Sequence, residues 1–103
     1  MTTTVARKRL EILIDTPLEP RLAAAAAEPG IGGYTVLPAL SGRGRRGVWH
    51  DERVAGAEAK LMFWIICAED KAARLIDLLA PHLDTHGIIL TLSDVEVVRG
   101  ERF

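Results

Sequence analysis

The longest uninterrupted apolar run of the chain, LMFWIIC, spans residues 61–67. A run without alternating polar residues is typical of a strand in the middle of a sheet, covered on both faces. We therefore expect a central strand over residues 60–68. The chain has 103 residues, a length that supports one hydrophobic core and leaves no room for a second. We expect a single domain over residues 1–103.

Two strands and a helix are predicted before this run. Apolar residues that alternate along the chain predict a strand over Leu10–Asp15. Five consecutive alanines favour a helix over Arg21–Glu28. Tyr34–Leu40 is predicted to be a strand, and its Pro38 lacks the N–H donor of a central strand. This strand is therefore expected at an edge of the sheet.

A second helix is predicted after the apolar run, because its apolar residues recur at intervals of three and four. Glu69 or Asp70 is expected to cap its start. For the first helix, Thr16 and Glu19 are alternative caps. The remaining apolar segments near the end of the chain predict two short strand pieces, Ile88–Leu92 and Val95–Val98.

The predicted order is strand, helix, strand, strand, helix, strand, which is the split βαβ pattern of a ferredoxin-like domain. We therefore predict an α+β fold, with an antiparallel sheet and both helices on one face. The other face then lacks a cover within the chain. Trp64 in the central strand indicates that an oligomer supplies this cover.

Residues 41–57 lose the apolar periodicity and contain four glycines and four arginines. Glycines let backbone amides come close to an anion, and guanidinium groups grip phosphate or carboxylate with a forked pair of hydrogen bonds. The spacing matches neither a Walker A loop nor a GxGxxG turn. The net charge of the whole chain is -1, so binding of nucleic acid is not expected. We expect a long, mobile loop that carries a local anion site.

Three short motifs resemble the PII signal-transduction proteins in sequence and in order. They are Gly30-Ile31-Gly32-Gly33-Tyr34-Thr35-Val36, Gly42-Arg43-Gly44-Arg45 and Ala55-Gly56-Ala57-Glu58. In that family, a G-I-x-G-x-T-V segment leads through a G-x-G-R turn into the T-loop, which ends in R-G-A-E. The resemblance covers nearly the whole chain from Leu10 and extends to Lys60, Asp94-Val95 and Arg99.

The resemblance implies a homotrimer of ferredoxin-like subunits, with an adenine nucleotide in each cleft between neighbours. Thr35 is then expected near the base, and Lys60 and Arg99 are expected to supply positive charge. The turn on the phosphate side is expected to comprise Gly42, Gly44 and Arg45. Further candidates near the nucleotide are Arg43, Arg46 and Arg102. A small domain has little room for a pocket of its own, whereas a trimer forms three pockets at its subunit interfaces.

The chain departs from the nitrogen-regulatory members of that family in three places. Its T-loop is shorter and has no tyrosine, so uridylylation is not expected. Arg46 stands where those members have a glutamine, which argues against sensing of 2-oxoglutarate. Their triphosphate loop, T-G-x-x-G-D-G-K, is reduced here to Thr85-His86-Gly87-Ile88. Gly87 stays a candidate nucleotide contact, and the loss of the lysine favours ADP or AMP over ATP.

These losses resemble PII-like proteins outside nitrogen control, among them the carboxysome-associated and bicarbonate-transporter-associated groups. We therefore hypothesise that Arg45 and Arg46 bind bicarbonate beside the nucleotide, because a guanidinium pairs well with a planar oxyanion. The resemblance implies a regulatory sensor that signals through ordering of the T-loop. Its target would be another protein, with a transporter or a carboxysome-associated protein as the implied class.

Trp49 and His50 lie in an otherwise polar segment and predict contact with that partner. No arrangement of nucleophile and base is recognisable, so the chain is not expected to be an enzyme. His82 and His86 lie four residues apart on the predicted second helix, but their spacing fits no zinc site and no metal is expected. Cys67 is expected in the core, and a cytoplasmic location is expected because no signal or membrane segment is recognisable.

Two alternative functions stay open at this stage. One is a metal-responsive trimer that resembles CutA, which has the same architecture. The other is an adaptor domain whose arginine-rich loop binds an acidic protein or RNA. Titration with nucleotides and with metals would separate the first alternative from a nucleotide sensor.

Overall fold

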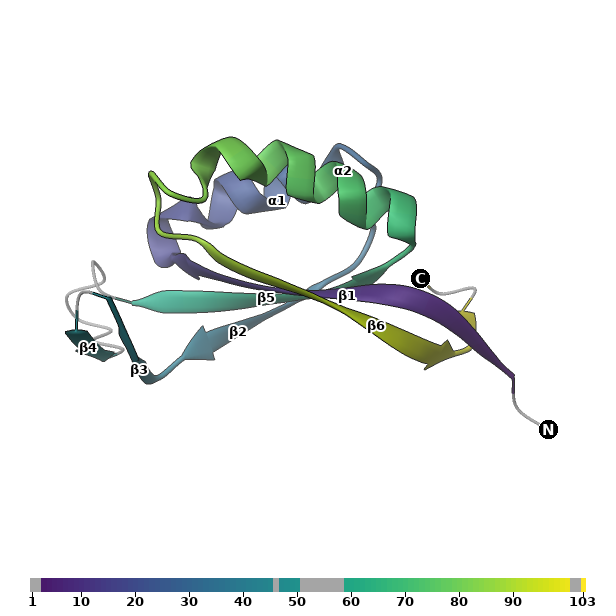
Figure 1. The fold of residues 1–103 in the computed structure, drawn as a ribbon, viewed down its shortest axis with the longest axis horizontal. Helices are drawn as coiled ribbons and strands as arrows, with labels where there is room; N and C mark the ends of the chain where they lie inside the picture. Colours follow the sequence, from purple (N-terminus) through teal and green to yellow (C-terminus); the bar gives the residue numbers. More distant parts are fainter. Residues whose placement is uncertain (1–2, 46, 51–58, 101–102) are drawn as a thin grey trace.

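A four-stranded antiparallel sheet with two helices on one face forms the body of the molecule (Figure 1). The computed structural model describes residues 3–45, 47–50, 59–100 and 103. The strand order in the sheet is β2-β5-β1-β6. This order confirms the ferredoxin-like prediction, with the apolar run in a central strand and the proline-containing strand at an edge. The strands are β1 (Thr4–Asp15), β2 (Thr35–Ala39), β5 (Lys60–Cys67) and β6 (Ile89–Val98).

The core lies between the sheet and the helices α1 (Glu19–Ala27) and α2 (Glu69–Leu79). Strand side chains point to alternate faces, so every second residue of β1 and β5 enters this core. Burial of each large apolar side chain contributes about 1.5–3 kcal/mol. Cys67 is buried, as predicted. The buried side chains of the two central strands are Leu10, Ile12, Ile14, Phe63, Ile65 and Cys67.

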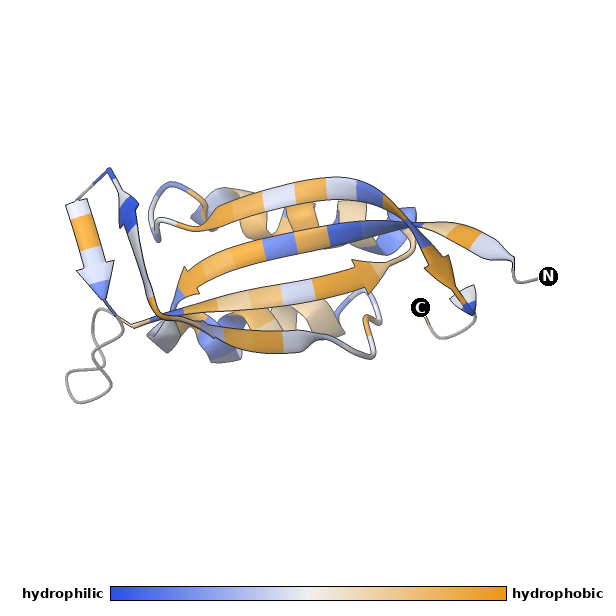
Figure 2. Cartoon of the chain, turned by 90° about the horizontal axis from the view of Figure 1, so that it is seen from below, coloured by the Kyte–Doolittle hydropathy of each residue, from blue (hydrophilic) through white to orange (hydrophobic). Residues whose placement is uncertain are grey.

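The opposite face of the sheet has no cover among the described residues (Figure 2). Both helices lie on the same side of the sheet, as predicted, so the described residues cover the central strand on one face (Figure 1). Cover of the other face by a second copy stays a prediction. Trp64 alternates with the buried residues Phe63 and Ile65 and is 38% exposed. Leu37 is 46% exposed and Ile89 is 57% exposed, and the strand register places both on this face with Trp64. We call this surface the uncovered face.

The helix starts differ from the predicted caps. Thr16 lies in a short 3-10 helix, η1 (Thr16–Leu18), and its hydroxyl donates to the Ala59 carbonyl at 3.0 Å instead of capping a helix. The second helix starts after Ala68, so Glu69 and Asp70 lie within its first turn. There the two carboxylates interact favourably with the positive end of the helix dipole. Among the described residues, no side chain caps the start of either helix.

The end of the second helix and the last strand also differ from the prediction. Pro81 ends the α-helical hydrogen bonding at Leu79, and a 3-10 turn, η2 (Ala80–His82), follows. The two predicted strand pieces are one continuous strand, β6, because Asp94 pairs with Lys8 of β1 and forms an ion pair with its ammonium group. No helix in the described part of the chain is long and apolar enough to cross a membrane.

Part of the predicted loop has regular structure. Strands β3 (Ser41–Gly44) and β4 (Gly47–His50) form a two-stranded hairpin beyond the end of β2 (Figure 1). The sequence analysis missed it because two of its strand residues are paired glycines, Gly44 and Gly47, which have low strand propensity. Residues 51–58, the rest of the predicted loop, lie outside the described residues.

Candidate functional site

The predicted nucleotide contacts fall into two groups at opposite ends of the β2–β5 pair. Thr35 pairs with Trp64 at one end, and Ala39 pairs with Lys60 at the other. Ala39 lies four positions after Thr35 in β2, which corresponds to roughly 13 Å at about 3.3 Å per residue. The hairpin with Gly42, Gly44 and Arg45 continues beyond the Lys60 end. Within one chain, the structure therefore does not bring the expected base contact and the expected phosphate contacts into one site.

A cavity of about 500 Å³ lies at the Thr35 end of the strand pair. Its floor is apolar and includes Trp64 and Ile66 of the uncovered face, together with the C-terminal Phe103. Cys67 also lines it, and burial raises the pKa of its thiol. None of the predicted arginines that the structure describes lines it. The other lining residues are Gly30, Ile31, Gly32, Gly33, Tyr34, Thr35 and Lys71.

The glycine-rich wall of this cavity begins where α1 stops. Gly30 adopts a φ of +87°, a backbone conformation that favours glycine, and its N–H donates to the Ala27 carbonyl at 3.0 Å. Lys71 of α2 donates to the Gly30 carbonyl at 3.1 Å and so ties the second helix to this segment. The Tyr34 ring stacks on the buried Phe63 ring, with centroids 5.1 Å apart. These contacts hold the segment that carries Thr35 against the sheet.

At the other end, the Trp49 ring packs against Gly42. The two residues are paired across the hairpin, and a Cβ atom on Gly42 would lie 2.5 Å from Trp49 Cζ2. The Lys60 ammonium lies 5.4 Å from the centroid of the same ring, within cation–π distance. Trp49 is thus half-buried within its own chain, whereas His50 is exposed. The predicted partner contact of these two residues stays a prediction.

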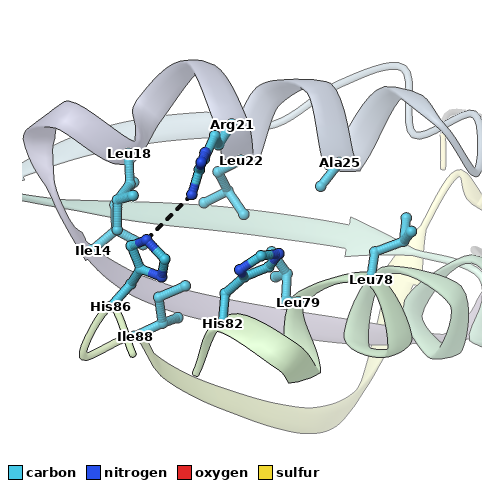
Figure 3. A pocket seen from close by; sticks show the side chains of 10 residues that line it. All are labelled: Ile14, Leu18, Arg21, Leu22, Ala25, Leu78, Leu79, His82, His86 and Ile88. Carbon is cyan, nitrogen blue, oxygen red and sulfur yellow. Dashed lines mark hydrogen bonds between the residues drawn. The ribbon is translucent and has the colours of Figure 1, made fainter. Parts of the chain in front are cut away.

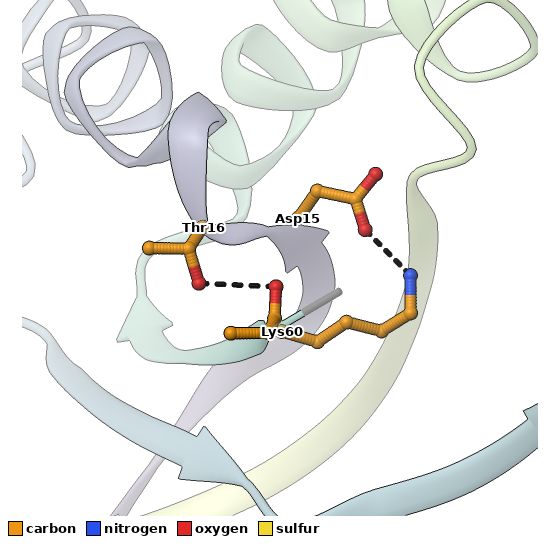
Figure 4. Close-up of polar contacts among 4 residues, drawn as sticks. Asp15, Thr16 and Lys60 are labelled. Carbon is orange, nitrogen blue, oxygen red and sulfur yellow. Dashed lines mark hydrogen bonds and ion pairs between the residues drawn. The ribbon is translucent and has the colours of Figure 1, made fainter. Parts of the chain in front are cut away.

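Lys60 is held at the base of the hairpin segment by an ion pair that the sequence analysis missed. Its Nζ lies 2.6 Å from Asp15 Oδ1 (Figure 4). Beside this pair, the Thr16 N–H and hydroxyl both donate to the Ala59 carbonyl, at 3.1 and 3.0 Å. The strand register, which places Asp15 directly opposite Lys60, is the signal that would have revealed the pair. A phosphate at Lys60 would compete with a carboxylate that is already bound.

The remaining predicted residues divide between the same two ends. Arg43 and Arg45 are exposed on the hairpin. Gly87, with a φ of +61°, lies just before β6, and the register places this start of β6 at the Lys60 end. Arg99 lies just after β6, at the end of that strand opposite to Gly87. It has a φ of +62°, an uncommon value for a residue other than glycine. Arg46 and Arg102 lie outside the described residues.

A model of the family described as nitrogen regulatory protein P-II matches residues 7–102. This match spans nearly the whole sheet and both helices. The chain belongs to the P-II family. No curated protein sequence matches this chain at a significant level.

Solved structures of PII-like proteins share the fold of this P-II chain. CPII from Thiomonas intermedia K12, bound to ADP, AMP and bicarbonate, superposes with a TM-score of 0.92 at 22% identity, covering 100% of this chain and 98% of that one. CPII bound to ADP and bicarbonate gives 0.89 at 22% identity, covering 100% and 99%. A protein from Thermus thermophilus described as a putative PII-like signaling protein gives 0.80 at 28% identity, covering 97% of each chain.

His82 and His86 lie on the helix-covered side of the sheet and do not line the Thr35 cavity. His82 ends the 3-10 turn η2 and His86 lies in the loop that follows. The prediction that both histidines lie on the second helix is therefore wrong. Their ring centroids are nevertheless 5.5 Å apart. Among the described residues, no three histidine, cysteine, aspartate or glutamate side chains form a group that would hold a metal ion.

Proposed function

We propose that this P-II chain is a regulatory sensor that binds an adenine nucleotide, ADP or AMP in preference to ATP, between the subunits of a homotrimer. One observation carries the proposal. The cavity at Thr35 contains an apolar floor and a glycine-rich wall, but the hairpin with its exposed arginines lies at the opposite end of the strand pair. A neighbouring subunit that brings its hairpin to this cavity would complete a nucleotide site.

The chemistry of the cavity suits a purine. Trp64 and Phe103 offer aromatic surface, and a base that stacks on such a ring gains about 1–3 kcal/mol. Thr35 supplies a hydroxyl group that both donates and accepts hydrogen bonds. The cavity volume, about 500 Å³, lies within the usual range for small-molecule sites, roughly 300–1,000 Å³.

The hairpin end suits the phosphates. Arg43 and Arg45 are exposed and can form forked pairs with phosphate oxygens, and Gly42 and Gly44 leave the backbone between them accessible. Lys60 adds a charge that Asp15 partly neutralises. Gly87 lies at this end too, but the short loop around it lacks the lysine that would hold a third phosphate. This shortage of donors favours ADP and AMP.

The uncovered face supports the trimer. Its central residues include Leu13, Met62 and Trp64, which the strand register places on the side away from the helices. Exposed apolar area of this kind is a usual mark of a protein interface. Because Trp64 belongs both to this face and to the cavity, a subunit that covers the face also reaches the cavity.

Bicarbonate is the proposed second ligand. The CPII structures with ADP and bicarbonate belong to a chain with the same fold. In this chain the hairpin residues Arg45 and Arg46 are the candidates to pair with it, beside the terminal phosphate of ADP or AMP. The absence of a third phosphate would leave space for a small planar oxyanion.

Signalling would follow from a shift between conformations of residues 41–57. A ligand that gains contacts only when the hairpin is docked on the neighbouring subunit must favour the docked state. Trp49 and His50 would move with the hairpin and present a different surface to a target protein in each state. A transporter or a carboxysome-associated protein is the proposed class of target.

The test is calorimetry on the full chain with AMP, ADP and ATP, each with and without bicarbonate and magnesium. We expect ADP and AMP to bind more tightly than ATP, and bicarbonate to increase their affinity. Arg45→Ala should lower the ADP affinity about tenfold, because a hydrogen bond to a charged group contributes about 1.5–3 kcal/mol. The matched control is Arg74→Ala on the outer surface of α2. Absence of heat and of thermal stabilisation with every nucleotide would overturn the proposal.

A further inference from the structure

A second cavity, of about 330 Å³, lies between the start of α1 and the end of α2, on the helix-covered side of the sheet (Figure 3). We call it the helix-end pocket. Seven of its ten described lining residues are apolar and the other three are Arg21, His82 and His86. None of these ten described residues carries a carboxylate. The apolar residues are Ile14, Leu18, Leu22, Ala25, Leu78, Leu79 and Ile88.

A chain of hydrogen bonds fixes the polar side of the pocket. The Arg21 guanidinium has donors alone, so its Nη1 donates to His86 Nε2 at 3.2 Å. The proton of this imidazole is then on Nδ1, which donates to Thr85 Oγ1 at 2.9 Å. The Thr85 hydroxyl in turn donates to the His82 carbonyl, at a longer 3.5 Å. Arg21 is the one arginine or lysine among the ten described lining residues.

Arg21 therefore differs from the other arginine on the helices. Arg74 forms a two-pronged ion pair with Glu28, at 3.0 and 3.1 Å. Arg21 has the His86 imidazole as its partner, and no carboxylate among the described residues lies within ion-pair distance of it. A guanidinium at the mouth of an apolar cavity, with donors left over, fits a carboxylate that comes with its own apolar body.

A metal ion fits this pocket less well than an anion. A cation at His86 Nε2 would have to displace the Arg21 guanidinium and then lie beside its positive charge. His82 is the one further imidazole among the described lining residues, with its ring edge-on to His86 at 5.5 Å between centroids. Figure 3 shows Arg21 reaching from α1 toward the His86 ring across the opening.

We propose that the helix-end pocket binds a short-chain monocarboxylate, with its carboxylate on Arg21 beside the two imidazoles and its hydrocarbon chain against Leu18, Leu22 and Leu79. The volume is at the lower end of the usual range for small-molecule sites, roughly 300–1,000 Å³, which suits a short hydrocarbon chain. The pocket shares no described lining residue with the Thr35 cavity, so the two proposals stand or fall independently.

The test is a titration of the nucleotide-free full chain with sodium hexanoate, followed by the imidazole signals of His82 and His86 in NMR spectra and by calorimetry. We expect saturable shifts of both histidines. Hexanol, which has the same chain and no charge, should bind at least tenfold more weakly, because it cannot form the charge-assisted pair with Arg21. Acetate should also bind at least tenfold more weakly than hexanoate, because it lacks the apolar chain.

Variants distinguish hexanoate binding in the helix-end pocket from nonspecific binding to the protein surface. Arg21→Ala should weaken hexanoate binding at least tenfold, and Arg21→Lys should give an intermediate loss because it keeps the charge and loses the fork. Arg74→Ala should leave the affinity unchanged. Absence of histidine shifts up to about 10 mM hexanoate would overturn the proposal. Equal binding of hexanol, an unaffected Arg21→Ala variant, or tight Zn²⁺ binding that blocks hexanoate would overturn it too.

Discussion

Ile12 and Leu13 are neighbours in β1, yet they belong to two differently covered faces of the sheet. Ile12 is fully buried under the helices. Leu13 points to the uncovered face, where it pairs with Met62 on one side and Ile89 on the other, and is half-buried. The described part of the chain therefore completes its own core on one face of the sheet alone. The other face, with Trp64 lining the Thr35 cavity, is the one that a second copy would complete.

The largest effect is expected from shortening a side chain of the helix-covered face. Ile12→Ala should lower the free energy of unfolding by about 2–5 kcal/mol, because it removes buried methyl groups and leaves a cavity. Urea denaturation followed by circular dichroism measures the change. Val48→Ala, at an exposed position of the hairpin, is the control and should change the free energy by less than about 0.5 kcal/mol. A loss below about 1 kcal/mol for Ile12→Ala would contradict the assigned core.

A charge on the uncovered face should break the proposed trimer and spare the fold. Leu13→Asp would bury a carboxylate between subunits, which costs several kcal/mol. The molar mass from light scattering should then fall from that of three 11.2 kDa chains to that of one. The helix and strand signals in circular dichroism should be unchanged. Leu13→Met, a substitution of similar volume, should keep the trimer. A trimer that survives Leu13→Asp unchanged would show that this face does not form the interface.

A smaller effect is expected within the hairpin. Gly42→Ala places a Cβ atom against Trp49, so the ring must move away from Gly42 at a cost of about 1 kcal/mol. Tryptophan fluorescence in a Trp64→Phe background should shift toward the emission of an exposed ring. Gly44→Ala is the matched control, because a Cβ atom there meets no other described atom within 4 Å. Identical spectra for the two variants would contradict the packing of Trp49 on Gly42.

The smallest effect concerns the surface pair of Glu28 and Arg74. The hydrogen bond from Arg74 lowers the pKa of Glu28 below its usual 4.5. A lowered pKa in the folded state means that the pair stabilises the fold above about pH 4.5 and that this stabilisation is lost as the pH falls through the folded-state pKa. Thermal midpoints of the native chain and of Arg74→Ala should therefore differ slightly at about pH 6 and converge near about pH 3. A constant difference would contradict the assignment.

The order of strands and helices was predictable because it depends on local apolar periodicity. β5 and β1 were recognisable as strands from residues that each lie within one short segment. The uncovered face was predictable from the order of the elements, because that order places both helices on the same side of the sheet, but not from the segment around Trp64 alone. The role of Thr16 also depends on a distant residue, since its hydroxyl bonds to Ala59.

The site was predictable only in its local motifs. The segment from Gly30 to Thr35, which carries one of the motifs that resemble PII proteins, lines a cavity. The predicted contact of Thr35 with a base stays a prediction. Lys71 and Phe103 join it from elsewhere in the chain, and no spacing rule connects them to it. The Asp15–Lys60 ion pair requires knowledge of the strand register. The helix-end pocket likewise forms where the two helices meet, so no single segment reveals it.

We propose that each nucleotide site combines the Thr35 cavity of one subunit with the hairpin of a neighbour. Two inactive variants, Thr35→Glu and Arg45→Glu, test it when they are refolded together and titrated with ADP. Random mixing of equal amounts of the two variants should pair an intact cavity with an intact hairpin at about a quarter of the subunit interfaces. We predict that each variant alone fails to bind ADP and that the mixture regains about that fraction of sites. A mixture that stays as inactive as its components would contradict a site shared between subunits.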